Sequence, residues 1–592
     1  MRQPFLAQGR RVFIFVVCTL LASLQLAHRS AAQGNRPEQA GWGHRGQAAL
    51  NRLGGRLPEV AARHKMTPAQ LARSLRDDAN LWLDPSDRLV YLDDFVAQEA
   101  PRASGGGSTA AAPLPYEQTF FLHSLPGATK TIYLDFDGHT TSGTAWNANF
   151  NGGADIVSTP FDMDGKPAFS NAELDRIQLI WQRVAEEYAP FAVDVTTQDP
   201  GVEALRNLGD GDPAWGIRVI ISPTNYFYSS AGGVAYIGSF TWNNDTPTFA
   251  FTTQLGPNGE KYIADAVTHE VGHTLGLSHD GVNGVTAYYQ GDADTGTPSW
   301  APIMGIGYYQ TLVQWSKGEY ANANNLQDDL AIIATNNGFT YRNDDHSNAL
   351  SGATPLTVNG TSVSGKGLIE RTTDLDYFSF QTGAGTVSFN VTGNPRDANL
   401  DVQVTLYDAN GTAILVNNPA GLSASFSTTL TAGTYYLALD GAGTGDPAQG
   451  YYSDYGSLGE FTISGTVAAA TTVSQPSVMH LGNLNHANSL AKNGSWNATV
   501  TVTAHATGDS MLGGAAISGT FSYGAMKKTV SCVTSARQQG TCTMSVSGLS
   551  SATASVTFAV NNMTLSGYGY AAELNHDPDG SSNGVSVAIA KP

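Results

Sequence analysis

His269 to Asp280 reads HEVGHTLGLSHD, a run in which three histidines accompany one glutamate and two glycines. On an α-helix, His269 and His273 stand four residues apart, so both imidazoles project from one face and can reach the same Zn²⁺. Gly276 can adopt a positive φ and end the helix. The chain can then turn back and bring His279 to the metal as a third ligand. A fourth position remains for water, as a catalytic zinc requires.

Glu270 adjoins the first ligand, where its carboxylate can accept a proton from a zinc-activated water. A bare HExxH is a weak signal, because two helical histidines beside a glutamate can be ordinary surface residues. The longer pattern HExxHxxGxxH, completed by a downstream methionine, is the metzincin signature. Pro302-Ile303-Met304-Gly305 offers that methionine. The chain therefore resembles a metzincin zinc endopeptidase.

The metzincin resemblance implies roles for further residues. Met304 would form an apolar floor beneath the metal without binding it. Asp280, directly after His279, is similar to the reprolysin pattern, in which this carboxylate supports the lower subdomain and is not a ligand. In some metzincins a tyrosine two residues after the methionine reaches the zinc. Ile306 occupies that position here, so a fifth ligand from Tyr308 or Tyr309 stays open.

The expected catalytic domain, residues 116–342, has a mixed α+β pattern. Ser170 and Glu173 form a capping box for a long amphipathic helix that Pro190 ends. Strands are expected near 131–136, 191–197, 218–222, 231–240 and 248–253, and a last helix near 325–335. This order resembles the metzincin fold, a twisted mixed sheet with long helices. There, substrate pairs with an exposed edge strand, for which 232–239 is the candidate. An ordinary edge strand fits those residues equally well.

The N-terminus has the features of a secretory signal peptide over residues 1–32. Arginines precede an apolar run at 12–24, and small residues at 30–32 offer a cleavage site. The run is too short to span a membrane, so no stable membrane insertion is expected. Cys532 and Cys542 are the cysteines that remain after such cleavage. In an oxidising compartment they are expected to form a disulfide. The formal net charge of −19 disfavours nucleic-acid binding.

Residues 33–115 are expected to be a small helical pro-segment and linker. Thr67 and Pro68 suit the start of a helix, and residues 101–115 form a linker rich in Gly, Ser, Ala and Pro. The placement suggests a zymogen, although a permanent small domain is the alternative. No cysteine lies between residues 33 and 531, so a zinc-blocking group must be another residue. The available carboxylates are Asp84, Asp87, Asp93 and Asp94, and the sequence does not choose among them.

Two all-β modules are expected after the catalytic domain. Residues 343–468 contain short strands separated by turn signals, such as Leu375–Phe380 and Ala432–Leu437. They resemble the bacterial pre-peptidase C-terminal domain, a β-sandwich of secreted peptidases, and a generic β-sandwich is the alternative. Residues 473–592 resemble an immunoglobulin-like β-sandwich of bacterial surfaces. Such modules suggest contact with a cell surface or matrix.

Three acidic loops are candidate calcium sites or ordinary turns. They are Asp162–Gly165, Gly291–Asp294 and Asn575–Asp579. The first resembles an EF-hand loop, but Asn171 stands where the twelfth-position glutamate is required. A turn is the simpler interpretation of that loop.

These patterns predict a secreted zinc-dependent endopeptidase that hydrolyses peptide bonds of extracellular proteins, with Glu270 as general base. The rival interpretation is a surface adhesin or matrix-binding protein on a non-catalytic metzincin scaffold. The two β modules favour some binding role. However, His269, His273, His279 and Glu270 are all present, whereas a decayed enzyme usually loses one of them.

Overall fold

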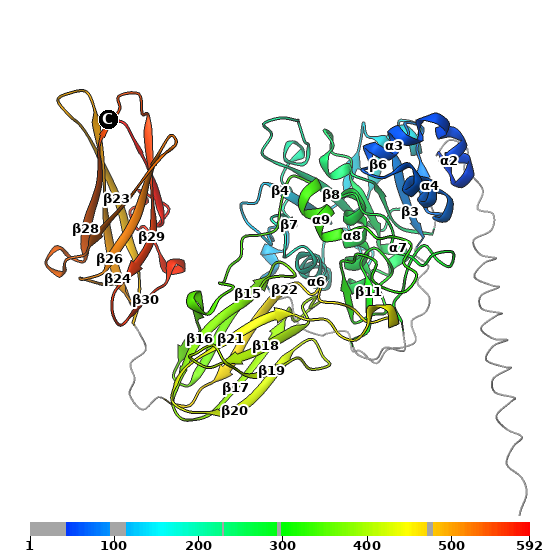
Figure 1. Ribbon diagram of the computed structural model, residues 1–592. Coiled ribbons are helices and arrows are strands. Elements are labelled where there is room, and N and C mark those ends of the chain that lie inside the picture. The colour runs from blue at the N-terminus through cyan, green and yellow to red at the C-terminus, as the bar shows by residue number, and fades with distance from the viewer. Residues whose placement is uncertain (1–42, 95–113, 228–229, 293–297, 470–476) are drawn as a thin grey trace, which may run out of the picture. The chain divides into compact units, whose positions relative to one another are not determined.

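A computed structural model describes residues 43–94, 114–227, 230–292, 298–469 and 477–592 (Figure 1). The expected signal peptide at 1–32 and most of the linker at 101–115 lie outside these ranges. The chain divides into two compact units, Met1–Ala469 and Ala470–Pro592. The division falls close to the boundary expected at residue 473. Among the described residues, no helix combines the length and apolar character needed to cross a membrane.

An eight-stranded mixed sheet forms the first layer of unit 1, in the order β1-β2-β3-β9-β10-β8-β4-β7. β7, β4, β8 and β10 run parallel, whereas β9, β3, β2 and β1 continue the sheet with antiparallel pairings. The strands are β1 (His44–Arg45), β2 (Leu81–Leu83), β3 (Leu89–Asp94), β4 (Lys130–Asp135), β7 (Asp194–Thr196), β8 (Trp215–Ser222), β9 (Ala231–Tyr236) and β10 (Thr248–Phe251). Short pairs β5 (His139–Thr141) with β6 (Ile156–Ser158), and β11 (Trp300–Pro302) with β12 (Leu312–Gln314), lie outside it.

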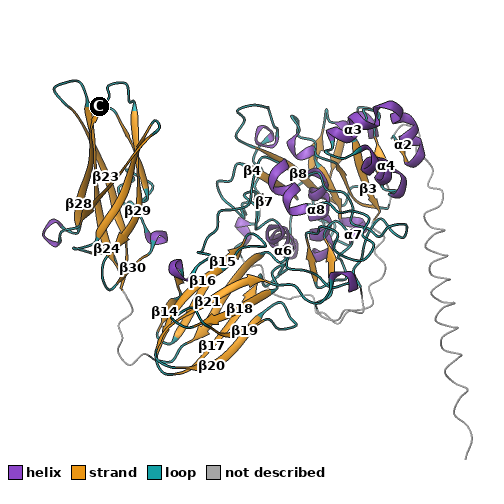
Figure 2. Ribbon diagram, viewed as in Figure 1, coloured by secondary structure: helices purple, strands orange, loops and turns teal. Residues whose placement is uncertain are grey.

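Helices accompany this sheet, as Figure 2 shows. They are α2 (Gly46–Leu53), α3 (Leu57–Arg63), α4 (Pro68–Asp77), α5 (Ala145–Phe150), α6 (Asn171–Glu187), α7 (Thr252–Leu255), α8 (Glu260–Thr274) and α9 (Asp329–Asn336). The predicted capping box is confirmed at α6, where the Ser170 hydroxyl accepts from the Glu173 backbone and the Glu173 carboxylate accepts from the Ser170 N–H. α6 and α8 share one apolar core with β4 and β8, through residues such as Ile177, Val271, Ile132 and Val219.

The prediction of a small helical N-terminal segment holds only in part. Helices α2 to α4 do form, and Thr67 caps α4 as expected. However, the chain then forms the hairpin β2–β3, and β3 joins the main sheet by pairing with β9. Asp84 turns the hairpin, since one carboxylate oxygen accepts the backbone N–H groups of Ser86 and Arg88. Segment 43–94 is therefore part of the eight-stranded sheet.

The second half of unit 1 is a β-sandwich of two five-stranded sheets, β13-β16-β21-β18-β19 and β14-β15-β22-β17-β20. Buried and partly exposed residues alternate along β16, as they must when one face packs on a core. The strands are β13 (Thr354–Pro355), β14 (Thr357–Asn359), β15 (Ser362–Ile369), β16 (Asp376–Thr382), β17 (Gly385–Gly393), β18 (Val402–Tyr407), β19 (Ala413–Asn417), β20 (Ala424–Leu430), β21 (Gly433–Gly441) and β22 (Gly459–Thr466).

Buried polar bonds join this sandwich to the helices before it. The Asn399 amide donates to the buried Glu187 carboxylate at 2.6 Å. The Tyr455 hydroxyl donates to Asp328, the N-cap of α9, at 2.7 Å and accepts the Leu330 N–H at 2.9 Å. Removing residues 343–468 would leave these buried groups without partners, which argues for a sandwich that stays with the sheet.

Unit 2 is a second sandwich. One sheet has the order β25-β24-β23-β30 with β28 also on β24, and the other has β27-β26-β29-β31. The strands are β23 (Ser477–Leu490), β24 (Trp496–Ala506), β25 (Ser510–Met511), β26 (Ala516–Tyr523), β27 (Met526–Val533), β28 (Thr541–Leu549), β29 (Ser555–Thr564), β30 (Tyr568–Tyr570) and β31 (Ser586–Ala590). Trp496, Phe521 and Phe558 lie in a core of its own.

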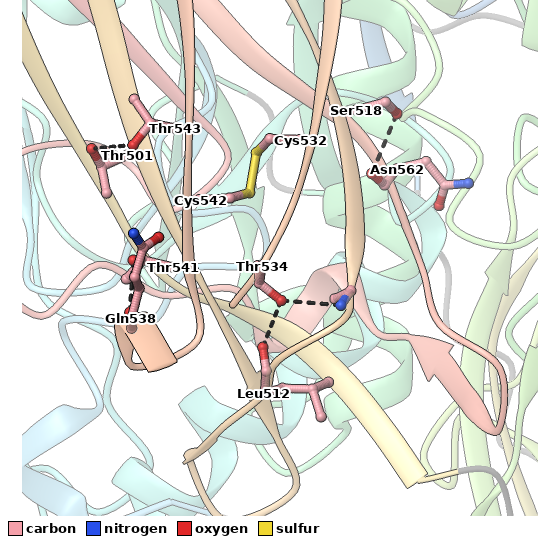
Figure 3. Close-up of a disulfide and its surroundings, with 11 residues drawn as sticks. Thr501, Leu512, Ser518, Cys532, Thr534, Gln538, Thr541, Cys542, Thr543 and Asn562 are labelled. Atoms are coloured by element: carbon pink, nitrogen blue, oxygen red, sulfur yellow. Dashed lines mark hydrogen bonds between the residues drawn. A yellow bond between two sulfur atoms is a disulfide. The ribbon is translucent and has the colours of Figure 1, made fainter. Parts of the chain in front are cut away.

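The predicted disulfide between Cys532 and Cys542 is confirmed (Figure 3). It joins β27 to β28, which belong to different sheets, so it bridges the two layers. Close to it, the Thr534 hydroxyl donates to the Leu512 carbonyl at 2.7 Å and accepts the Ala515 N–H at 3.0 Å. The covalent link and these bonds hold one edge of the sandwich closed.

We expect Tyr455→Phe to lower the free energy of unfolding by about 1 kcal/mol, because Asp328 and the Leu330 N–H lose a buried partner. Thermal unfolding of the purified protein measures this. Tyr436→Phe on β21 is the matched control, since that hydroxyl makes no hydrogen bond to any described residue. Equal stability of the two variants would contradict the proposed role of Tyr455.

Candidate metal centre and active site

Helix α8 and the turn after it bring the three histidines together. His269 and His273 lie on one face of α8, and all three imidazoles are buried. Gly276 has φ 105°, a conformation that favours glycine, and its N–H donates to the His273 carbonyl. The chain reverses there, which places His279 Nε2 3.1 Å from His273 Nε2. The helix end predicted at Gly276 is thus observed.

Each imidazole is oriented by an oxygen at its Nδ1 atom. His269 Nδ1 lies 2.8 Å from the Ile303 carbonyl, and His273 Nδ1 lies 2.8 Å from the Leu277 carbonyl. His279 Nδ1 lies 2.6 Å from the Asp78 carboxylate. A carbonyl oxygen can only accept, so Nδ1 of His269 and His273 carries the hydrogen. Their Nε2 atoms then offer a lone pair to a metal.

The fourth member of the cluster is Asp93, which comes from strand β3. Its Oδ2 lies 3.3 Å from both His269 Nε2 and His273 Nε2, and its Oδ1 lies 3.2 Å from His279 Nε2. The four ligand atoms lie within 4.8 Å of one another. Asp93 has 0% exposure, so its charge must be compensated inside the protein.

This donor set fits zinc. Three imidazole nitrogens and one carboxylate oxygen are the ligand types of Zn²⁺, and four of them make a closed tetrahedral set. Burial holds the pKa of His273 down to about 4, which keeps the imidazole neutral as a ligand must be. The same burial opposes charge on His279, but Asp78 and Asp93 outweigh it and raise its pKa to about 10. His279 is therefore the imidazole that can hold a proton when no cation balances Asp93.

Glu270 lies beside this cluster, against strand β9. A Cβ atom at Gly233 would come within 2.1 Å of Glu270 Oε1, so only glycine leaves room for the carboxylate there. Neither Glu270 oxygen has a hydrogen-bond partner among the described residues. Burial, and then the nearby Asp93 charge, raise the pKa of Glu270 well above its usual value. A buried carboxyl of raised pKa is suited to accept and return a proton.

Met304 and Asp280 pack beside the helix and the turn that carry the three histidines. Met304 is fully buried, and its sulfur is so close to Gly272 of α8 that an added Cβ would lie 2.5 Å from it. The Asp280 N–H donates to the Met304 carbonyl at 2.8 Å. The Asp280 carboxyl is buried, which raises its pKa to about 7, and it does not join the four-residue cluster. The roles of Met304 as a floor beneath the metal and of Asp280 as a support stay predictions.

Sequence reasoning missed three contributors. Asp78 orients His279, and Tyr91 stacks on His273 with ring centroids 4.0 Å apart. The Tyr288 hydroxyl donates to Asp93 Oδ1 at 3.0 Å. Two of the three belong to the N-terminal segment. The one available signal was the alternation in β3, which places Tyr91 and Asp93 on the same side of the strand.

Tyr308 and Tyr309, the tyrosines considered as a fifth ligand, both pack against Tyr262 of α8. The tyrosines that contact the histidine cluster are Tyr288, through Asp93, and Tyr91, which stacks on His273. Whether a tyrosine binds the metal stays a prediction.

The proposed substrate edge, 232–239, is covered by β3 in this structure. β3 pairs antiparallel with β9, with Tyr91 opposite Ala235 and Asp93 opposite Gly233. The pairing shifts by one residue after Asp93, and the Asp94 carboxylate accepts from the Ser230 hydroxyl at 2.5 Å. A segment of the same chain thus fills the place where an added strand would bind.

The candidate calcium loops behave mainly as turns. Asp162 accepts the backbone N–H groups of Asp164 and Gly165, although Glu173 lies within reach of both carboxylates. In the second loop, Ala293 and Asp294 lie outside the described residues. In the third loop the Asp579 carboxylate accepts from Asn483 and the Ser581 N–H.

Residues 202–280 match the family described as Metallo-peptidase family M12B Reprolysin-like. The matched range ends at Asp280 and so includes α8 and all three histidines. A search of curated proteins found no match. The family likeness supports a zinc-dependent metallopeptidase that acts on protein substrates.

Solved structures show weaker likenesses. One is the pre-peptidase C-terminal domain of a collagenase from Bacillus anthracis, at 14% identity and TM-score 0.15, covering 20% of this chain and 100% of that one. Another is PliG from Aeromonas hydrophila, a periplasmic inhibitor of g-type lysozyme, at 13% identity and TM-score 0.15, covering 19% and 94%. A GH2 β-galacturonidase from Eisenbergiella tayi gives 12% identity and TM-score 0.11, covering 35% and 34%. These TM-scores are too low for any of the three to carry an argument.

We expect Gly272→Ala to destabilise the protein by about 1–3 kcal/mol, because the new methyl group collides with the buried Met304 sulfur. The measurement is thermal or denaturant unfolding. Gly55→Ala is the control, since a Cβ there meets nothing within 4 Å. It should leave stability unchanged or raise it slightly. If both variants unfold alike, Met304 does not pack on α8 as described.

Proposed function

We propose that this protein is a secreted, metzincin-type zinc endopeptidase that is made as a latent precursor. The observation that carries the proposal is the convergence of three buried imidazoles beside Glu270. Their Nε2 atoms meet, and oxygens orient their Nδ1 atoms. The match of residues 202–280 to a metallopeptidase family supports the same conclusion. Secretion is supported by the N-terminal sequence and by the disulfide of unit 2.

His269, His273 and His279 would hold the zinc, which when bound supplies a Lewis acid for water and for the scissile carbonyl. Glu270 takes a proton from the attacking water at a carboxylate oxygen and returns it to the leaving amine. Gly233 lets Glu270 lie against β9. A substrate that paired with β9 would therefore lie next to the base. The Ile303 carbonyl orients His269 at Nδ1, and Met304 packs against Gly272 on the helix that carries His269.

Glu270→Gln should lower casein hydrolysis by the processed enzyme by about 10²–10⁴-fold, the usual contribution of a general base. Zinc content, measured by elemental mass spectrometry, should not change, because Glu270 is not among the four residues that could bind the metal. Glu117→Gln, at an exposed site, is the control and should retain full activity. Undiminished hydrolysis by Glu270→Gln would exclude this mechanism.

Latency follows from the place of Asp93. Its carboxylate lies 3.2–3.3 Å from the three Nε2 atoms and would act as a fourth zinc ligand, in the place that a catalytic zinc must leave to water. The same strand, β3, pairs with β9 and stacks Tyr91 on His273, so it excludes both water and substrate. Of the four candidate carboxylates, Asp93 is therefore the blocking group we propose. Activation would require cleavage and departure of segment 43–94.

Asp93→Ala should open the fourth position, whereas Asp94→Ala on the neighbouring residue should not. In a Glu270→Gln background the precursor stays uncut, so zinc loss to a chelator can be timed without activity. We expect faster zinc extraction from the Asp93 variant than from the parent, and an unchanged rate for the Asp94 variant.

With Glu270 intact, Asp93→Ala should also shorten the lifetime of the precursor, followed by gel electrophoresis of the secreted protein. Equal zinc extraction rates in the Asp93 and Asp94 variants would show that Asp93 does not block the metal. Unchanged precursor lifetime would show that β3, and not the carboxylate, maintains latency.

The β-sandwich of residues 343–468 fits the proposed pre-peptidase C-terminal module, and unit 2 fits an immunoglobulin-like module. We propose protein or peptide substrates for the enzyme and a surface or matrix contact for these modules. The rival, a non-catalytic adhesin, is less well supported, because the glutamate and the three histidines that catalysis would need are all present. Structural calcium remains a separate proposal, for which Asp162, Asp164 and Glu173 are the candidate ligands.

A further inference from the structure

Unit 2 contains a second cluster of histidines, far in sequence from the first. His480 comes from β23, His505 from β24, and His576 from the loop after β30. Asp509 lies in the turn between β24 and β25, with its Oδ1 3.0 Å from His480 Nε2, 3.7 Å from His505 Nδ1 and 3.9 Å from His576 Nε2. One ligand atom from each residue lies within 4.8 Å of the others.

The surroundings of the cluster orient it for a cation. His576 Nδ1 lies 3.1 Å from the Leu574 carbonyl, which assigns its hydrogen to Nδ1 and its lone pair to Nε2. The Asn575 side chain accepts the Leu481 N–H at 2.7 Å, and the His576 N–H donates to the Leu481 carbonyl at 3.0 Å. These two bonds fasten the loop to β23 and place His576 beside His480.

Local backbone features leave room for the side chains. The pairing of β23 with β24 skips Gly482, and a Cβ at that position would lie 2.1 Å from His505 Nδ1. Asp509 has φ 57°, a left-handed conformation that aspartate tolerates better than most residues. A bulge and a tight turn are thus built around the four side chains.

Burial differs across the cluster. The His480 side chain is 4% exposed and the His505 side chain 14%, whereas those of His576 and Asp509 are 38% and 65% exposed. His505 Nδ1 is buried and has no hydrogen-bond partner among the described residues, although it faces the Asp509 carboxylate. A cation would satisfy this nitrogen, and the exposed pair leaves a path for its entry.

We propose that His480, His505, His576 and Asp509 bind a divalent transition-metal cation of the zinc class. Three imidazole nitrogens and one carboxylate oxygen are suited to tetrahedral Zn²⁺ and unsuited to Ca²⁺, which takes oxygen ligands. With four protein ligands the site has no open position, so its role is structural. It fastens β23, β24 and the loop after β30 to one another. This site does not depend on the proposed peptidase activity.

The test counts zinc in the intact secreted protein, stripped with a chelator and titrated with Zn²⁺ under native mass spectrometry. The wild type should bind two equivalents, and His269→Gln should keep one. Asp509→Asn and His576→Gln should each bind one equivalent, because each loses the zinc of unit 2, which His269→Gln retains. Both positions are exposed, so neither substitution disturbs the core, and asparagine retains the left-handed turn.

His486→Gln is the matched control, because His486 is an exposed histidine on the same strand, β23, outside the cluster. It should bind two equivalents. In the His269→Gln background, Zn²⁺ should also raise the unfolding temperature, and Asp509→Asn should abolish that rise. No bound equivalent in His269→Gln would overturn the proposal. So would an unchanged count in both Asp509→Asn and His576→Gln.

Discussion

Asp93 is completely buried, and its carboxylate faces three imidazole nitrogens that converge on one point. A buried charge of this kind costs several kcal/mol unless a counter-charge accompanies it. The counter-charge is a cation among the imidazoles or a proton on His279. Strand β3, helix α8 and the chain after Gly276 all contribute to this centre. The arrangement of these three elements therefore depends on a positive charge that balances Asp93.

Strand β3 contacts both the histidine cluster and strand β9. Because side chains alternate along a strand, Tyr91 and Asp93 face the histidines while Val90 and Leu92 pack into another core. Backbone pairing with β9 covers the edge where a peptide would add. The segment thus pairs with the edge strand β9, brings Asp93 to the three histidines and provides Asp78 as the partner of His279 Nδ1. This combination is possible only because segment 43–94 is integral to the sheet.

The two C-terminal sandwiches differ in their relation to the enzyme. The first shares an apolar core and buried polar bonds with α6 and α9, so the helices and the sandwich stabilise one another. The second has its own core and its own disulfide. Its histidine cluster, like the first, is assembled from segments that are distant in sequence.

The sequence by itself determined the local features: the spacing of His269 and His273, the helix end at Gly276, the N-cap of α4, the capping box of α6, and the cysteine pair. Each depends on residues a few positions apart or on a simple count. It did not choose Asp93 among four carboxylates, nor reveal Asp78, Tyr288, Gly233 or the cluster around Asp509. Those depend on pairing between strands that are far apart in the chain, which local periodicity does not encode. Only the tertiary structure, by pairing β3 with β9 and fastening the His576 loop to β23, decided which side chains meet.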